Sequence, residues 1–77
     1  MPDHFAPHVF VRSALAYVAP GVDPDDLDHE LDLAPEDLYY LAASISLASG
    51  IDIPEHDALA LRTVRQIEEY LARHHFR

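Results

Sequence analysis

"APEDLYYLAASISLASG", residues 34–50, carries signals for the start, the body and the end of one helix. Pro35 suits the first helical position, because its missing N–H would have no partner inside the helix. Two acidic residues follow in the first turn, where the positive end of the helix dipole favours carboxylates. Gly50 stands where a left-handed residue commonly ends a helix. The stretch therefore predicts a helix from about Pro35 to Ala48.

The two sides of this predicted helix differ in chemical character. At helical spacing the core side would hold Leu38, Leu41, Ala42, Ile45, Ala48 and Ser49. The opposite side would hold Glu36, Tyr40, Ala43 and Leu47, flanked by Tyr39 and Ser46. No formal charge occurs between Asp37 and Asp52. The apolar outer side has the spacing of a helix that docks in a partner's groove, unless the preceding connection folds over it and buries it.

Two further main helices are predicted, one before and one after this stretch. The first covers residues 7–18 and would place one apolar side on the core, made of Phe10, Val11, Ala14, Leu15, Tyr17 and Val18. The last starts at Thr63, where Thr63 and Gln66 match a T-x-x-Q capping box. Its buried stripe would be Val64, Ile67 and Leu71. Residues 55–60 are expected to form one short helical turn.

An acidic segment, residues 22–33, joins the first two helices and is punctuated by Val22, Leu27, Leu31 and Leu33. A connection this long in a small domain is usually tied to the core, so we expect its leucines to hold it there. These elements predict an all-α fold, a four-helix bundle of three main helices plus one short helix, with a long loop after the first helix. Residues 1–77 would form a single domain, with residues 1–6 as a flexible N-terminus.

The composition narrows the classes of function. The 77 residues suffice for one domain with a modest core, and an apolar fraction of 49% argues against disorder. Five basic residues against fourteen acidic ones give a net charge of −9, which repels nucleic acid and attracts a protein with a basic patch. We find no apolar stretch of membrane-spanning length and no signal-peptide pattern, so we expect a cytoplasmic protein.

Four fragments carry a family resemblance, and they cover nearly the whole chain. They are "VAPGVDPDDLD" (18–28), "ELDL" (30–33), "SGIDIPEHD" (49–57) and "LRTVRQIEEYL" (61–71). In order and spacing the chain resembles the acyl carrier protein family, in its actinobacterial type. The resemblance implies an acyl-carrier-protein-like bundle that works in fatty acid, polyketide or other secondary metabolism.

The resemblance fails at the residues that give the family its chemistry. Carrier proteins open the second helix with Asp-Ser, and the serine receives 4'-phosphopantetheine from coenzyme A. In an ungapped alignment the Asp position falls on Ala34 and the serine position on Pro35. Proline offers no nucleophilic oxygen, so we expect no phosphopantetheine arm at this position and no cofactor.

The first functional hypothesis is therefore a non-catalytic docking, scaffold or regulatory module beside acyl- or aminoacyl-processing enzymes. Glu36 and Asp37 would supply the charged end of the contact, and Tyr40, Ala43 and Leu47 the apolar part. The second is a working carrier loaded at an unusual site, such as another serine. The third is a noncovalent acyl-chain binder, because the family holds acyl chains between its second and third helices. The lining residues of that cavity would be Leu38, Leu41, Ile45 and Leu59.

The sequence contains no clear pattern of catalytic residues or of metal ligands. We find no nucleophile paired with a base and no glycine-rich phosphate cradle, so no enzyme activity is predicted. The histidines, among them His4, His8, His74 and His75, lack cysteine or carboxylate partners at metal spacing, and we expect solvated surface side chains without a metal. A weak homodimer is left open. So is an unrelated helical bundle in which Pro35 is only a good first-turn residue.

Overall fold

Residues 6–74, which the computed structural model describes, form four helices. The helices are α1 (Pro7–Val18), α2 (Pro35–Ser49), α3 (Glu55–Ala58) and α4 (Val64–His74). Over residues 6–74 no strand is present, and the only β-type pairing is an isolated bridge between Glu30 and Thr63. Three main helices plus one short helix are as predicted. Residues 1–5 of the expected flexible N-terminus lie outside the described residues.

Local signals set the ends of α1 and α2. Both helices have proline in the first turn, and neither preceding alanine provides a side-chain cap. Gly50 adopts a φ of 78° and its N–H donates to the Ser46 carbonyl at 2.8 Å. One residue beyond the predicted end, Ser49 still belongs to α2, and its hydroxyl donates to the Ile45 carbonyl at 2.7 Å. The left-handed glycine therefore ends α2 as expected.

The start of α4 keeps half of the predicted capping box. Thr63 Oγ1 accepts the N–H of Gln66 at 3.1 Å, as the motif requires. The Gln66 side-chain oxygen, however, accepts the N–H of Arg62 at 2.7 Å, one residue before the expected donor. The glutamine thereby fixes the chain immediately before the helix.

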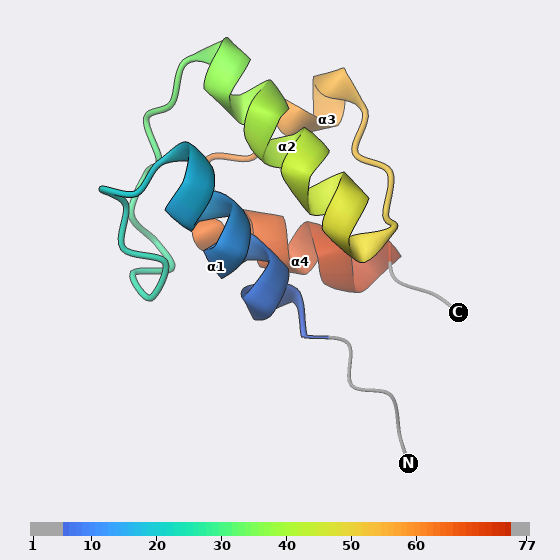
Figure 1. Ribbon diagram of the computed structural model, residues 1–77, viewed down its shortest axis with the longest axis horizontal. Helices are drawn as coiled ribbons and strands as arrows, with labels where there is room; N and C mark the ends of the chain where they lie inside the picture. Colours follow the sequence, from blue (N-terminus) through green and yellow to red (C-terminus); the bar gives the residue numbers. More distant parts are fainter. Residues whose placement is uncertain (1–5, 75–77) are drawn as a thin grey trace.

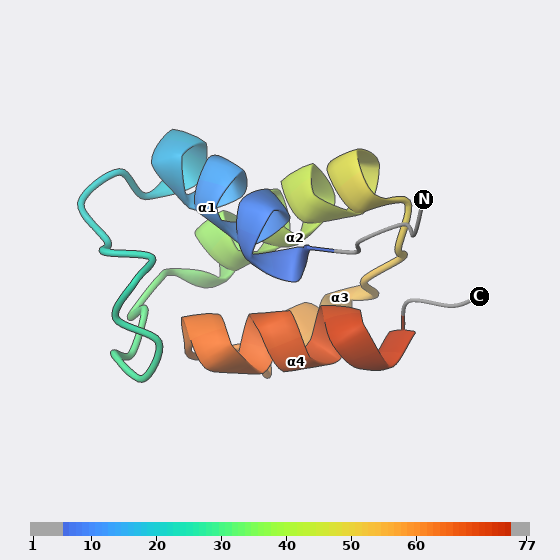
Figure 2. The same cartoon turned by 90° about the horizontal axis from the view of Figure 1, so that it is seen from below.

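The helices form two layers around one core. In Figure 2, α1 and α2 make the upper layer and α4 makes the lower layer, while α3 lies against α2. The largest fully buried side chains come from all three main helices: Val11 and Leu15, Ile45, and Val64, Ile67 and Leu71. The predicted stripe of α4 is confirmed. On the predicted inner side of α2, Leu41, Ala42 and Ile45 are buried, and Leu38 and Ser49 are partly buried.

The acidic connection after α1 is held against the start of α4. It descends from the α1 layer towards that end of the molecule (Figures 1 and 2). The Leu31 N–H donates to the Arg62 carbonyl at 2.8 Å, and the Arg65 N–H donates to the Leu27 carbonyl at 3.0 Å. Leu31 is buried, and Leu27 and Leu33 pack on the core as partly buried side chains. Its leucines therefore hold the connection in place, as predicted.

Three burial predictions differ from the structure. Tyr17 was expected on the core side of α1 but is 86% exposed, because it lies at the edge where α1 meets α2. Ala48 of α2 is likewise exposed. Tyr70, which the predicted stripe of α4 omitted, is buried: its ring stacks on His74 and its hydroxyl donates to Asp57 Oδ2 at 2.7 Å. None of the helices in residues 6–74 combines the length and the apolar character needed to cross a membrane.

Candidate functional site

The first turn of α2 lies open at the surface of the molecule. Pro35 occupies the first helical position and Ala34 precedes it in an extended conformation, and both are exposed. Neither side chain offers a hydroxyl or a carboxylate. The next two residues, Glu36 and Asp37, are exposed as well. The first three residues of α2 therefore present two negative charges and no hydroxyl or thiol.

The outer side of α2 continues from this acidic turn as an apolar surface. Tyr40 is 68% exposed, Leu47 is 88% exposed, and Ala43 between them is exposed. The acidic connection does not cover them, because its backbone bonds to Arg62 and Arg65 hold it at the start of α4. Burial of this stripe by the connection, the alternative raised by the sequence, is therefore wrong. We call Glu36, Asp37, Tyr40, Ala43 and Leu47 the α2 outer stripe.

Two side chains flank the α2 outer stripe and support it. Tyr39 is partly buried and packs on the core. The Ser46 hydroxyl accepts the N–H of Ile53 at 3.2 Å, which ties α2 to the connection that follows it. The stripe is thus carried by a helix whose inner side is fixed, so its side chains are presented on a rigid support.

A pocket of about 320 Å³ opens beside Pro35. Its walls come from the acidic connection, the start of α2 and the segment between α3 and α4: Leu31, Leu33, Pro35, Leu38, Leu59 and Leu61, with Glu30, Asp32 and Arg62. Two of the four residues that would line an acyl cavity, Leu38 and Leu59, lie in its wall. Leu41 and Ile45 do not, because they are buried in the core between the layers. The pocket therefore differs from the predicted cavity in two of the four proposed lining residues.

The serine side chains of α2 differ in their hydrogen bonds to the backbone. Ser49 donates to the Ile45 carbonyl and accepts the N–H of Ile51 at 3.1 Å. Ser46 accepts the N–H of Ile53. Such local bonds between hydroxyls and backbone are common in helices, and they leave these two oxygens poorly placed to attack a pyrophosphate. Ser44 is half-buried at the α1–α2 junction, and Ser13 is exposed on α1.

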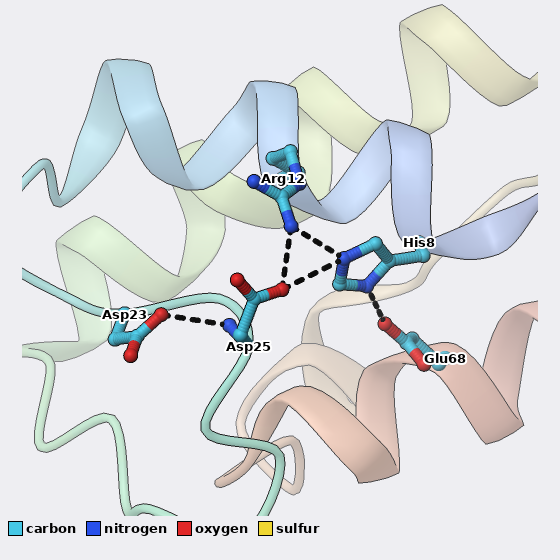
Figure 3. Close-up of polar contacts among 5 residues, drawn as sticks. All are labelled: His8, Arg12, Asp23, Asp25 and Glu68. Carbon is cyan, nitrogen blue, oxygen red and sulfur yellow. Dashed lines mark hydrogen bonds and ion pairs between the residues drawn. The ribbon is translucent and has the colours of Figure 1, made fainter.

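His8 joins three elements of the fold and is not the solvated side chain that the sequence suggested (Figure 3). Its Nδ1 lies 2.5 Å from Glu68 Oε2 of α4, and its Nε2 lies 3.0 Å from Arg12 Nη2. The same Arg12 nitrogen donates to Asp25 Oδ1 of the acidic connection at 2.5 Å. The Nε2 atom also lies 3.4 Å from Asp25 Oδ1, and the donor and acceptor roles of the two ring nitrogens depend on the tautomer of His8. We call these four residues the His8 cluster.

The His8 cluster ties α1 to α4 and to the acidic connection. Its two carboxylates lie at opposite nitrogens of the imidazole (Figure 3). Asp23 Oδ1 accepts the N–H of Asp25 at 2.9 Å, which fixes the turn that carries Asp25. His74 is the histidine that stacks on Tyr70. His4 and His75 lie outside the described residues.

Asp28 and Tyr70 have shifted pKa values. Arg65 donates to Asp28 Oδ1 at 2.7 Å, and this hydrogen bond and the positive charge lower the pKa of the Asp28 carboxyl. Burial, followed by the hydrogen bond to Asp57, raises the pKa of Tyr70 to about 12. Both shifts accompany contacts that fasten loops to α4, and neither group faces the α2 outer stripe. These contacts therefore concern the stability of the fold and not the α2 outer stripe.

In the part of the chain that the structure describes, no group of three or more His, Asp or Glu side chains is arranged to hold a metal ion. Comparison of the chain with protein-family models, with curated proteins and with solved structures found no match.

Proposed function

We propose that this chain is a carrier-protein-like docking module that binds acyl- or aminoacyl-transferring enzymes but holds no phosphopantetheine arm. The proposal joins the family resemblance of the sequence to the geometry of α2. A carrier-like sequence with Pro35 and Ala34 at the attachment positions can be recognised by such enzymes without being loaded. The chain would then act as a decoy, a scaffold or a regulator of a pathway that uses true carriers.

The observation that carries the proposal is the exposure of the α2 outer stripe. Tyr40 and Leu47 lie one above the other at helical spacing and remain largely in water. Helices that dock in grooves present anchors at this spacing. An exposed apolar stripe on an otherwise charged chain is typical of a protein-interaction surface.

The charges at the start of α2 define the partner further. Glu36 and Asp37 lie beside the apolar anchors, and the chain as a whole carries −9. A partner with an apolar groove bordered by Arg or Lys at one end would match both features. The negative field of the chain would steer such a partner, chiefly through the association rate.

The test is competition with a true carrier protein. The chain is added in increasing amounts to acyl- and aminoacyl-transferring enzymes, each assayed with its own loaded carrier. We expect the KM for the carrier to rise while kcat stays unchanged, because the chain occupies the docking surface without entering the reaction. Tyr40→Asp and Leu47→Asp should weaken inhibition by about tenfold or more.

Ala72→Asp is the matched control, because Ala72 is exposed on α4 and the substitution adds the same charge on another helix. It should leave inhibition unchanged. If no enzyme of this group is inhibited at chain concentrations well above its KM for the carrier, the proposed function is wrong. If the Asp variants at Tyr40 and Leu47 inhibit as well as the natural chain, the α2 outer stripe is not the contact.

A second candidate function rests on the pocket beside Pro35. Six of its nine lining residues are apolar, although the surface that the pocket exposes is more polar than apolar, and its volume of about 320 Å³ lies at the lower end of small-molecule sites. A short acyl chain could enter it without a covalent bond, with modest affinity because no tether raises its effective concentration. Native mass spectrometry after gentle purification tests this function. A copurifying lipid that is lost in Leu38→Ser supports it, and a bare chain at every lipid concentration tested contradicts it.

A further inference from the structure

The pocket beside Pro35 has charged residues of both signs in its walls. Of the residues that line it, Glu30 and Asp32 are acidic and Arg62 is basic, and the others are apolar. All three charged residues are exposed, whereas Leu31 and Leu61 are buried. The pocket therefore combines apolar walls with a mouth that carries a positive charge and two negative ones.

The opposite charges of this mouth do not neutralise one another in pairs. Within residues 6–74, Arg12 and Arg65 form ion pairs with carboxylates of the acidic connection. No ion pair and no side-chain hydrogen bond in the same residues includes Arg62, Glu30 or Asp32. A cation and two carboxylates that line one pocket without pairing are available to the charged groups of a ligand.

Backbone contacts hold the two charged walls beside each other. The Leu31 N–H donates to the Arg62 carbonyl at 2.8 Å, and Glu30 forms an isolated antiparallel bridge with Thr63. Asp32 has a φ of 52°, in the left-handed region that residues other than glycine adopt rarely. The acidic connection and the segment before α4 are thus fixed relative to each other where they carry these charges.

The apolar walls suit a short side chain. Leu31 and Leu61 are buried, Leu38 is partly buried, and Leu59 is 40% exposed, so part of its apolar surface can be covered by a ligand. The volume of about 320 Å³ lies at the lower end of small-molecule sites. The pocket therefore admits a compact molecule with one apolar group.

We propose that the pocket beside Pro35 binds a free α-amino acid with an apolar side chain, such as leucine. Arg62 donates to the α-carboxylate, because the planar guanidinium matches the two oxygens of a carboxylate. Glu30 and Asp32 accept from the α-ammonium group, and the leucines of the walls cover the side chain. The ligand thereby pairs with both signs of charge and with the apolar walls.

The charges select this class of ligand over two simpler ones. The carboxylate of a fatty acid can pair with Arg62, but it also meets Glu30, Asp32 and the negative field of a chain of charge −9. An alkylamine can pair with the two carboxylates, but it brings its positive charge towards Arg62. A zwitterion has no net charge, so the field of the chain does not repel it, and each of its charged groups finds an opposite one.

This inference rests on the second candidate function only in requiring that the pocket is a ligand site. It differs in the ligand, because an acyl chain needs the apolar walls alone, whereas an amino acid needs both signs of charge as well. It is independent of the docking proposal, since Glu30, Asp32 and Arg62 do not belong to the α2 outer stripe.

NMR titration of the ¹⁵N-labelled natural chain with four probes tests the inference. The probes are leucine, 4-methylpentanoate, which lacks the ammonium group, 3-methylbutylamine, which lacks the carboxylate, and glycine, which lacks the side chain. We expect leucine to shift the amide signals of residues 30–33 and 59–62 with a Kd of about 1 mM or lower. Each of the other probes should bind at least about tenfold more weakly.

Variants that match the probes show which charge meets which group. Arg62→Gln should raise the Kd for leucine by about tenfold and should not weaken binding of 3-methylbutylamine, which has no carboxylate. Arg62→Lys, which keeps the charge, should restore much of the affinity. Glu30→Gln with Asp32→Asn should weaken leucine and not 4-methylpentanoate, and asparagine also tolerates the left-handed conformation.

Arg73→Gln and Glu69→Gln are the matched controls, because both residues are exposed on α4 and lie outside the walls of this pocket. They should leave the Kd for leucine unchanged. Circular dichroism confirms that each variant keeps the helix content of the natural chain.

Three results overturn the inference, and they differ in what else they overturn. If 4-methylpentanoate binds as tightly as leucine, the amino-acid ligand is wrong and the acyl-chain function stands. If neither probe shifts any signal up to about 20 mM, the pocket is not a ligand site and both fall. If leucine binds equally well to Arg62→Gln and to the Glu30→Gln, Asp32→Asn variant, the charges of the mouth do not recognise it.

Discussion

Two substitutions in α2, Leu47→Ala and Ile45→Ala, should differ sharply in their effect on stability, although the residues are neighbours in the same helix. Ile45 is 0% exposed and belongs to the core between the two layers, whereas Leu47 is 88% exposed on the outer side. The pair measures whether the outer side of α2 contributes to folding or is free for another contact.

The magnitudes follow from the exposed fractions. Full burial of a leucine side chain is worth about 1.5 to 3 kcal/mol, and only about an eighth of Leu47 is covered. Leu47→Ala should therefore change the free energy of unfolding by about 0.3 kcal/mol, within the scatter of surface substitutions. Ile45→Ala removes fully buried atoms and leaves a cavity, so a loss of about 2 to 5 kcal/mol is expected.

Urea unfolding followed by circular dichroism measures both values, at about 5 µM chain so that self-association is negligible. If Ile45→Ala unfolds the chain outright, Ile45→Val, with an expected loss of about 1 kcal/mol, replaces it. A loss above about 1 kcal/mol for Leu47→Ala would mean that another part of the chain covers Leu47 in solution. The α2 outer stripe would then not be free to dock.

Three further predictions concern the ends and ties of the helices. Gly50→Ala should destabilise the chain by about 1 kcal/mol in urea unfolding, because φ is 78° and no atom lies within 4 Å of the new Cβ, so backbone strain is the whole effect. The natural chain should lose stability below about pH 4, as Asp28, whose lowered pKa reflects Arg65, becomes protonated. Asp28→Asn should lack this part of the loss, and identical acid-unfolding curves would contradict the assignment. Tyr70→Phe should cost about 1 kcal/mol at neutral pH. Because the Tyr70 pKa is raised to about 12, the natural chain should also lose stability between pH 10 and 12, and a Tyr70→Phe chain with the same alkaline profile would refute this.

The helix bounds could be predicted because their signals are local. Pro7, Pro35 and Gly50 each fix a helix end through their own backbone geometry. The threonine cap of α4 needs only a residue three positions away. Such signals do not depend on where the other helices lie, so the sequence was enough to place them.

Features that depend on distant contacts escaped the sequence. His8 bonds to Glu68, 60 positions away, and lies beside Arg12 and Asp25, and no spacing rule connects the three elements involved. Tyr17 has the spacing of a core residue, yet its side chain is exposed at the junction of α1 and α2. Burial of an amphipathic position is decided by the partner helix, not by period alone.

The candidate site also has one part that the sequence could predict and another part that depends on distant contacts. The outward orientation of Tyr40 and Leu47 follows from helical period alone, and the structure confirms it. The lining of the pocket beside Pro35 does not, because it depends on how the acidic connection and the segment before α4 approach the start of α2. Leu41 and Ile45 accordingly belong to the core instead.

Intact mass measurement of the chain after incubation with coenzyme A and a permissive phosphopantetheinyl transferase tests the central claim most directly. The natural chain should keep its mass of 8.7 kDa. The double variant Ala34→Asp with Pro35→Ser, which restores the residues that carrier proteins place there, should gain the mass of one phosphopantetheine arm. An arm attached to the natural chain would contradict the account.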